Sequence, residues 1–178
     1  MKFDLVRFDP ARHAALLTRF LCAHEWPFHG CLRPGPEVVE RWLAEARFDG
    51  DDARSAWVLA GDEPAGLIAL QEIGDPTPVF DLRVAAAWRR RGVGRRALAW
   101  AVEESFGPLD KRRLEAHTRA DNGPMRGLLR AEPGWVQEAH HRQAWPDHQG
   151  GWVDAVTYAL LRDDRARGAR TPVPPLEP

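Results

Sequence analysis

Cysteine is scarce in this sequence. Only two of its 178 residues are cysteines, Cys22 and Cys31, and they form neither a C-x-x-C pair nor part of a convincing set of zinc ligands. This scarcity argues against a secreted domain held together by disulfides and against a bound metal. A reducing compartment, the cytoplasm, is therefore the expected location.

Long apolar runs and an excess of one charge are also missing. No stretch approaches the roughly 18 apolar residues of a membrane helix, and the N-terminus lacks an apolar signal region. Lys and Arg number 25 and Asp and Glu number 26, which gives a formal net charge of -1, and the two signs are mixed along the chain. We therefore expect no membrane partner and no nucleic-acid partner.

What the chain does contain is enough for one packed domain. Its apolar content is 44% and it has eight tryptophans, well above what a disordered chain carries. A length of 178 residues suits a single core. After Arg162 the composition shifts to Asp, Arg, Pro and Gly. We therefore expect a single domain at residues 1–162 and a flexible tail at residues 163–178.

The spacing of apolar residues predicts a mixture of strands and helices. Three strands in the first half are expected to form an antiparallel meander, because Gly61-Asp62-Glu63-Pro64 is typical of a hairpin turn. The predicted strands span residues 3–8, 55–60, 65–73, 79–85, 113–119, 136–145 and 151–161, and the predicted helices span 10–24, 36–48, 94–106 and 124–131. This order predicts an α+β fold with a mixed, largely antiparallel central sheet flanked by helices.

Residues 89–97 concentrate arginine and glycine between a predicted strand and a predicted helix. Gly92 and Gly94 allow a tight turn and keep side chains out of the way, so that successive backbone N–H groups can point at an anion. The N-terminus of the following helix and the neighbouring arginines add positive charge. The segment therefore predicts a site for a cofactor that carries a diphosphate.

The same residues resemble a known signature. Leu82-x-Val84 followed by Arg89-x-x-Gly92-x-Gly94 is similar to the acetyl-CoA motif of the GNAT superfamily of N-acetyltransferases, Q/R-x-x-G-x-G/A, which follows the fourth strand and opens the third helix. The resemblance extends over nearly all of residues 1–162. Residues that are also similar to the ribosomal-protein N-terminal acetyltransferase branch are Asn122, Gly134-Trp135, Glu138 and the run from Trp152 to Leu161.

The resemblance implies an enzyme that transfers the acetyl group of acetyl-CoA to a primary amine by direct attack in a ternary complex. The acceptor would be a protein N-terminus, an amino acid or another small amine. Backbone groups of the fourth strand would hold the pantetheine arm and stabilise the developing oxyanion. The residues that would bind acetyl-CoA are Leu82, Arg83, Val84, Arg89, Arg90, Arg91, Gly92, Val93, Gly94, Arg95 and Asn122. By analogy the family also admits a homodimer formed through the final strands.

Two other phosphate-binding motifs compete for the glycine segment. Residues 92–97 also fit the dinucleotide pattern G-x-G-x-x-A, with Glu115 about 20 residues further on as a ribose ligand. However, three arginines separate the strand from Gly92, and the preceding strands form a meander where a βαβ unit would be needed. A P-loop is excluded because its Gly-Lys-Ser/Thr ending is missing.

An amine must lose a proton before it can attack, so the enzyme needs a general base. The first candidate is Asp81, just before the acetyl-binding backbone, although strand alternation could instead turn it into a salt bridge with Arg83 or Arg113. The second is Glu72, near the end of the third strand. Weaker candidates on the fifth strand are Glu115 and His117.

The usual general acid of the family is missing here. Many members protonate the departing thiolate with a tyrosine on the fourth helix, where this chain has Leu128-Leu129-Arg130, and its only tyrosine is Tyr158. A CoA thiol, with a pKa of about 8.5 by analogy with cysteine, can leave without a dedicated acid. The absence also permits a second hypothesis, a non-catalytic acyl-CoA-binding or sensor domain. The aromatic loop from Trp26 to Phe28, with His29, could shape the acceptor pocket.

Overall fold

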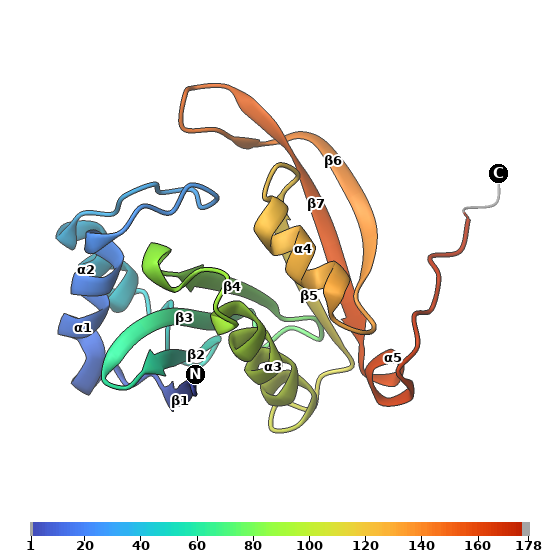
Figure 1. The fold of residues 1–178 in the computed structure, drawn as a ribbon, viewed down its shortest axis with the longest axis horizontal. Coiled ribbons are helices and arrows are strands. Elements are labelled where there is room, and N and C mark those ends of the chain that lie inside the picture. The colour runs from blue at the N-terminus through green and yellow to red at the C-terminus, as the bar shows by residue number, and fades with distance from the viewer. Residues whose placement is uncertain (1, 176–178) are drawn as a thin grey trace.

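A seven-stranded sheet runs through the computed structural model, which describes residues 2–175 (Figure 1). The strand order is β1-β2-β3-β4-β5-β7-β6, and all neighbours are antiparallel except β4 and β5. The elements are β1 (Asp4–Arg7), α1 (Pro10–Ala23), α2 (Pro36–Ala44), β2 (Ala53–Ala60), β3 (Glu63–Gln71), β4 (Val79–Val84), a 3-10 turn η1 (Ala86–Trp88), α3 (Val93–Phe106), β5 (Arg113–Arg119), α4 (Gly123–Ala131), β6 (Val136–Pro146), β7 (Trp152–Leu161) and α5 (Arg162–Arg167). The predicted fold class is confirmed.

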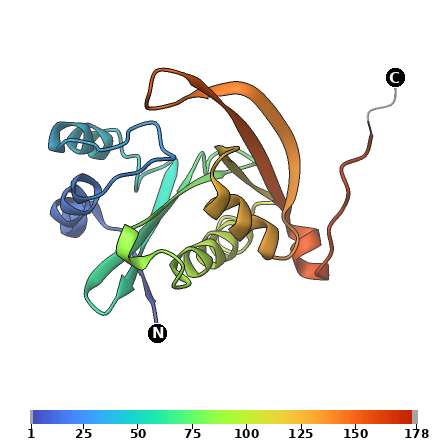
Figure 2. The ribbon, with the colours of Figure 1, turned by 45° about the horizontal axis from the view of Figure 1, so that its top comes forward.

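Helices cover both faces of the sheet, with α1 and α2 on one side and α3 and α4 on the other (Figures 1 and 2). The two cores divide the strands by alternation. In β3, Ile68 and Leu70 pack towards α3, whereas Leu67 and Ala69 pack towards α1 and α2. Because β3 is buried on both faces, its sequence is a continuous apolar run.

The strands β4 and β5 pair at one position only. Val79 lies opposite Glu115, and no further pair joins the two strands within residues 2–175. Neighbouring residues in a sheet point to the same face, so Asp81 and His117, each two residues further on, share the face of Val79 and Glu115. The backbone edge of β4 that faces β5 is therefore left without a strand partner beyond Val79.

The second helix is shorter than expected. The second helix ends at Ala44 instead of residue 48, and Ala46 takes a left-handed conformation at φ 53°, which no helix continues. The chain then turns so that Phe48 is buried in the core beneath α1 and α2. A window of apolar spacing cannot distinguish this buried turn from one more turn of helix.

The segment predicted as a flexible tail begins with the short helix α5. Asp164 is 1% exposed and accepts hydrogen bonds from the Thr171 hydroxyl at 2.6 Å and the Thr171 backbone N–H at 2.9 Å. Arg170 donates to the carbonyl oxygen of Arg130 at 2.9 Å. The packed structure therefore extends past the predicted boundary at residue 162. Met1 and residues 176–178 of the predicted domain and tail lie outside the described residues.

Within the part of the chain that the structure describes, no helix has both the length and the apolar character needed to cross a bilayer. In the same range, no three residues among the His, Cys, Asp and Glu side chains are grouped as metal ligands would be.

Candidate active site

The turn before α3 is shaped to receive an anion. Gly92, the N-cap of α3, has a left-handed φ of 91°, and a Cβ placed there would have no atom within 4 Å, so the position is open. The first helical hydrogen bond runs from the Arg96 N–H to the Gly92 carbonyl at 3.0 Å. The amides of residues 93–95 therefore precede the intrahelical ladder and are available to a ligand.

Two arginines beside this turn hold unpaired positive charge. The guanidinium groups of Arg90 and Arg96 are exposed and make no hydrogen bond, ion pair or aromatic contact with residues 2–175. By contrast, Arg91 stacks over Trp88 at 5.4 Å, and Arg95 pairs with Glu132 at 2.7 Å. An open turn, free amides and unpaired cations suit the diphosphate of a nucleotide cofactor.

Close packing fixes the turn against the sheet. Val93 is buried, and a Cβ on Gly66 of β3 would lie 2.9 Å from both the Val93 side chain and the Arg83 carbonyl. Only glycine at position 66 allows α3 to approach β3 and β4 this closely. Gly94, one residue into the helix, is half-buried and faces Leu128 of α4.

Arg89 has a different role from its neighbours. Its Nε donates to the Val84 carbonyl at 3.2 Å, and its Nη2 donates to the Glu25 carbonyl at 3.4 Å. Val84 ends β4, and Glu25 belongs to the loop at residues 24–35 between α1 and α2. Arg89 therefore joins the end of β4 to this loop, called the α1–α2 loop from here on.

Asp81, the first predicted base, is held in a salt bridge. Its Oδ2 accepts hydrogen bonds from Arg83 Nε and Nη2 at 3.2 and 3.0 Å, and its Oδ1 accepts one from His29 Nε2 at 2.8 Å. Burial by itself raises the pKa of Asp81, but Arg83 and His29 outweigh it and hold that pKa far below its usual range. A carboxylate whose pKa lies this low is a weak base near neutral pH.

Glu72, the second predicted base, lies away from Asp81. It follows β3 with a left-handed φ of 56°, and its side chain is exposed. The β3–β4 pairing ends before it, at Gln71 and Val79, on the side where β4 and β5 are still joined. Among the described residues, its carboxylate has no hydrogen-bond or ion-pair partner. The structure does not bring the two predicted bases together.

Asn122 is occupied as a helix cap. Its Oδ1 accepts a hydrogen bond from the Met125 N–H at 3.2 Å, and its Nδ2 donates to the Thr118 hydroxyl at 2.9 Å. These bonds account for an asparagine at the start of α4 without a cofactor. Its predicted contact with acetyl-CoA remains a prediction.

Residues 19–135 match the family described as Acetyltransferase (GNAT). The chain belongs to this acetyltransferase family. The match spans the glycine turn, all of β4 and β5, and the α1–α2 loop. No curated protein matches the chain significantly.

Solved structures of similar fold are also acetyltransferases. The spermidine/spermine N-acetyltransferase SpeG from Vibrio cholerae has a TM-score of 0.72 at 19% identity, covering 93% of this chain and 96% of that chain. A GNAT-family acetyltransferase from Streptococcus pneumoniae has a TM-score of 0.73 at 18% identity, covering 90% and 99%. The ribosomal-protein-S18-alanine N-acetyltransferase from Escherichia coli has a TM-score of 0.69 at 16% identity, covering 90% and 94%. At these identities the likeness establishes the GNAT fold.

In this GNAT chain the α1–α2 loop reaches across from β4 to β5. Arg119 of β5 donates to the Pro27 carbonyl at 3.5 Å, and its guanidinium lies 5.9 Å from the centre of the Phe28 ring. His148, between β6 and β7, also donates to the Pro27 carbonyl, at 3.2 Å. On the other side, Arg83 stacks over Trp26 at 5.4 Å. The loop is therefore held on both sides of the point where β4 and β5 part.

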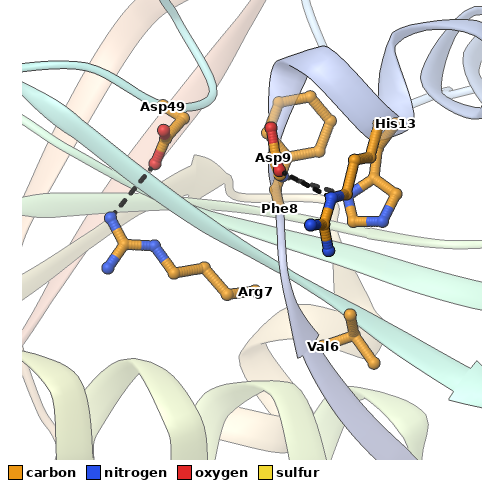
Figure 3. Close-up of a pocket in the computed structure, with 7 residues that line it drawn as sticks. Val6, Arg7, Phe8, Asp9, His13 and Asp49 are labelled. Carbon is orange, nitrogen blue, oxygen red and sulfur yellow. Dashed lines mark hydrogen bonds and ion pairs between the residues drawn. The ribbon is translucent and has the colours of Figure 1, made fainter.

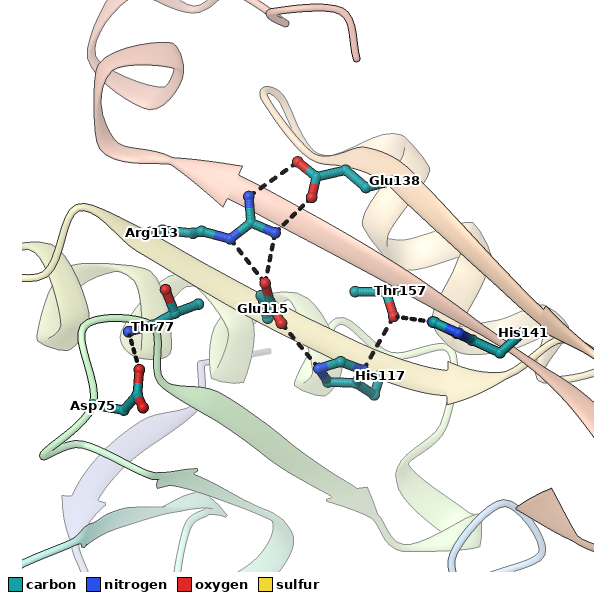
Figure 4. A network of polar contacts seen from close by, with 8 residues as sticks. All are labelled: Asp75, Thr77, Arg113, Glu115, His117, Glu138, His141 and Thr157. Carbon is teal, nitrogen blue, oxygen red and sulfur yellow. Dashed lines mark hydrogen bonds and ion pairs between the residues drawn. The ribbon is translucent and has the colours of Figure 1, made fainter. Parts of the chain in front are cut away.

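A chain of polar contacts crosses β6, β5 and β7 (Figure 4). Arg113 binds Glu115 Oε1 through Nε at 2.8 Å and Glu138 Oε1 through Nη1 at 3.1 Å. Hydrogen bonds to Glu138 and Glu115 raise the pKa of Arg113, although burial opposes them. Sequence reasoning did not find this network, although polar residues at alternate positions 113, 115 and 117 of β5 signalled one polar face.

The network continues from Glu115 through a histidine pair. His117 Nε2 lies 3.1 Å from Glu115 Oε2, and its Nδ1 lies 3.1 Å from the Thr157 hydroxyl. His141 Nε2 lies 3.0 Å from the same hydroxyl. Both ring nitrogens of His117 are thus engaged within the protein, so His117 has no free nitrogen for a substrate proton.

A separate hollow lies away from the glycine turn (Figure 3). It is lined by Val6, Arg7, Phe8, Asp9, Arg12, His13 and Asp49, around the edge strand β1. Its charges are already paired, Arg7 with Asp49 at 3.3 Å and Arg12 with Asp9 at 3.4 Å. Unlike the glycine turn beyond β4, three strands away, this hollow offers no unpaired arginine to an anion.

Proposed function

We propose that the protein transfers the acetyl group of acetyl-CoA to a primary amine in a ternary complex. The observation that carries the proposal is the open glycine turn, with its free amides and unpaired arginines, at the end of a strand whose edge has no partner. This is the arrangement that a diphosphate and an extended pantetheine arm require.

The residues for this role divide by the part of the cosubstrate that they would hold. The amides of residues 93–95 and the guanidinium groups of Arg90 and Arg96 would bind the diphosphate, and the free edge of β4 at Leu82–Val84 would bind the pantetheine amides. Arg91 and Arg95 lie close by and would exchange their present partners for phosphate oxygens. Acetyl-CoA supplies the activated acyl group, and the protein supplies position and electrostatics.

The acceptor would enter on the face of β4 and β5 that the α1–α2 loop spans. That face carries the carboxylates of Asp81, Glu115 and Glu138, which attract a cation, although all three are partly neutralised by arginines. A primary amine, either a small amine or a peptide N-terminus, suits this surface. The structural neighbours named for spermidine and for a ribosomal protein are consistent with both kinds of acceptor.

Of the two predicted bases, the geometry favours a role for Asp81 and none for Glu72. Asp81 lies on β4 next to the proposed thioester position, whereas Glu72 is exposed beyond the end of β3. The cytoplasmic location and the homodimer through the final strands remain proposals.

Isothermal titration of the full chain with acetyl-CoA tests the cofactor, and release of free CoA in the presence of amines tests the reaction. The panel should contain spermidine, single amino acids and peptides with free N-termini. Binding together with CoA release supports the enzyme. Binding without release for every amine would favour the sensor hypothesis, and absence of binding would overturn both.

A further inference from the structure

One histidine beside Asp81 has a ring nitrogen with no partner. His29 Nε2 is 2.8 Å from Asp81 Oδ1, whereas His29 Nδ1 is buried and makes no hydrogen bond within residues 2–175. Buried polar atoms are nearly always hydrogen-bonded in native proteins, so an unpartnered one calls for an explanation.

The protonation of the pair follows from the carboxylate. Arg83 and His29 keep the pKa of Asp81 far below its usual range against the opposing effect of burial, so Asp81 is ionised and can only accept hydrogen bonds. In its neutral form His29 then carries its proton on Nε2, which donates to Asp81, and the lone pair is on Nδ1. This is the tautomer that a general base needs, and Asp81 fixes it.

The position of His29 agrees with such a role. Asp81 comes directly before Leu82–Val84, the stretch of β4 proposed to hold the thioester, and it faces the α1–α2 loop. His29 belongs to that loop, two residues after the Pro27 carbonyl that Arg119 and His148 hold. The imidazole is thus fixed near the place where the acceptor and the acetyl group would meet.

We propose that His29 is the general base of the transfer and that Asp81 is its positioning residue. The inference rests on the proposed function and deepens it. Nδ1 takes one proton from the acceptor ammonium and frees the nitrogen lone pair, which forms the C–N bond to the acetyl carbon. The C–S bond breaks with its electron pair on sulfur, and the thiolate receives the second amine proton. His29 then returns its proton to solvent.

The charged groups around His29 set the expected pH dependence. On β4, Asp81 contacts the His29 ring, and Arg83 binds the other carboxylate oxygen of Asp81. Arg119 from β5 and His148 from the β6–β7 connection bind the neighbouring Pro27. Within the loop, Glu25 and Arg33 pair with each other. Glu115 and His117 lie on the facing strand. Asp81 is the carboxylate in direct contact with the imidazole. A general base acts only in its unprotonated form, so activity should fall in acid.

The first test needs no variant. Long-range proton–nitrogen NMR of the full chain at neutral pH should show His29 as the Nε2–H tautomer, and Asp81→Asn should disturb that assignment. A Nδ1–H tautomer in the wild-type protein would overturn the inference, whatever the activity.

The second test uses His29→Gln, with His140→Gln as the matched control because His140 pairs with Asp154 on the hairpin, outside the site. We expect His29→Gln to bind acetyl-CoA within about twofold of wild type and to lose about 100-fold or more in kcat. The acidic limb of its pH–rate profile should move to higher pH, because only acceptor that is already deprotonated can then react. Asp81→Asn should also lower kcat, and the control should match wild type.

The outcomes separate this inference from the proposed function. If the wild type turns over and His29→Gln retains both its rate and its acidic limb, His29 is not the base, although the acetyltransferase proposal stands. If the wild type binds acetyl-CoA without turnover, or does not bind it, the proposed function fails and the inference fails with it.

Discussion

Arg89 and Glu25, far apart in the sequence, are joined by a hydrogen bond of 3.4 Å from the Arg89 guanidinium to the Glu25 carbonyl. The same guanidinium binds the carbonyl that ends β4. One motif arginine thus connects the proposed cofactor turn with the loop proposed to border the acceptor.

This connection predicts different effects for two arginines. Arg89→Ala removes the bonds that position the α1–α2 loop, so the KM for the amine should rise about fivefold, the equivalent of about 1 kcal/mol. Arg96→Ala should weaken acetyl-CoA binding instead, because that guanidinium is free to bind phosphate. Steady-state kinetics and calorimetry on both variants measure the two effects. If Arg89→Ala and Arg96→Ala changed the KM for the amine and the affinity for acetyl-CoA to the same extent, Arg89 would not act through the α1–α2 loop.

Gly92→Ala should weaken acetyl-CoA binding and lower stability by about 1–2 kcal/mol, because an alanine is strained at a φ of 91°. The matched control is Gly127→Ala in α4, where a Cβ would meet nothing within 4 Å and alanine favours the helix. The control should gain about 0.5–1 kcal/mol. Denaturant unfolding and calorimetry measure both. If Gly92→Ala had wild-type stability, position 92 would tolerate a Cβ better than its φ of 91° indicates.

The Asp81 salt bridge predicts a loss of stability in acid. Its pKa in the folded chain lies below that of the unfolded chain, so its contribution is complete above about pH 5 and is lost as the pH falls through and below about 4. Asp81→Asn should therefore cost about 1–3 kcal/mol at pH 7 and progressively less towards pH 3. Urea unfolding across this range gives the difference. A cost that is constant with pH would mean that the charge of Asp81 does not matter.

Asp164 should control access to the end of the chain. Hydrogen bonds from the Thr171 hydroxyl, and then from the Thr171 backbone, lower the pKa of Asp164, so this contact is present at neutral pH and lost in acid below about pH 4. Asp164→Asn and Thr171→Val should both speed proteolysis after residue 162 at pH 7. Thr171→Ser, which keeps the hydroxyl, should not. If all three variants were cleaved at the same rate, the contact between Asp164 and Thr171 would not be what anchors the end of the chain.

Glu72→Gln should leave kcat/KM within about twofold of wild type, because its exposed carboxylate lies outside the proposed site. Turnover with the best amine of the panel measures this. A large loss with unchanged folding would restore Glu72 as the base.

Local features of the site could be predicted from the sequence. The turn at Gly92 depends on adjacent residues, so its glycines predicted its conformation, whereas the diphosphate cofactor that its arginines indicate remains a prediction. The ends of most strands and helices were also predicted closely, because apolar periodicity and turn residues specify them.

Contacts that depend on register or on loop path could not be predicted. His29 and Asp81 are far apart in sequence, and only the path of the α1–α2 loop brings them together. The contact between His117 and Thr157 depends on the pairing of β5 with β7, where a shift of one residue would turn the side chains to opposite faces. Strand alternation left the direction of Asp81 open, and the salt bridge with Arg83 is one of the alternatives it allowed.

Gly66 illustrates how far the requirements of such a site can extend. The residue belongs to β3 and lies outside the glycine turn itself, yet any larger residue would force the first turn of α3 away from β4. A substitution at Gly66 should therefore weaken binding of the proposed cosubstrate, although Gly66 is not among the residues proposed to contact it.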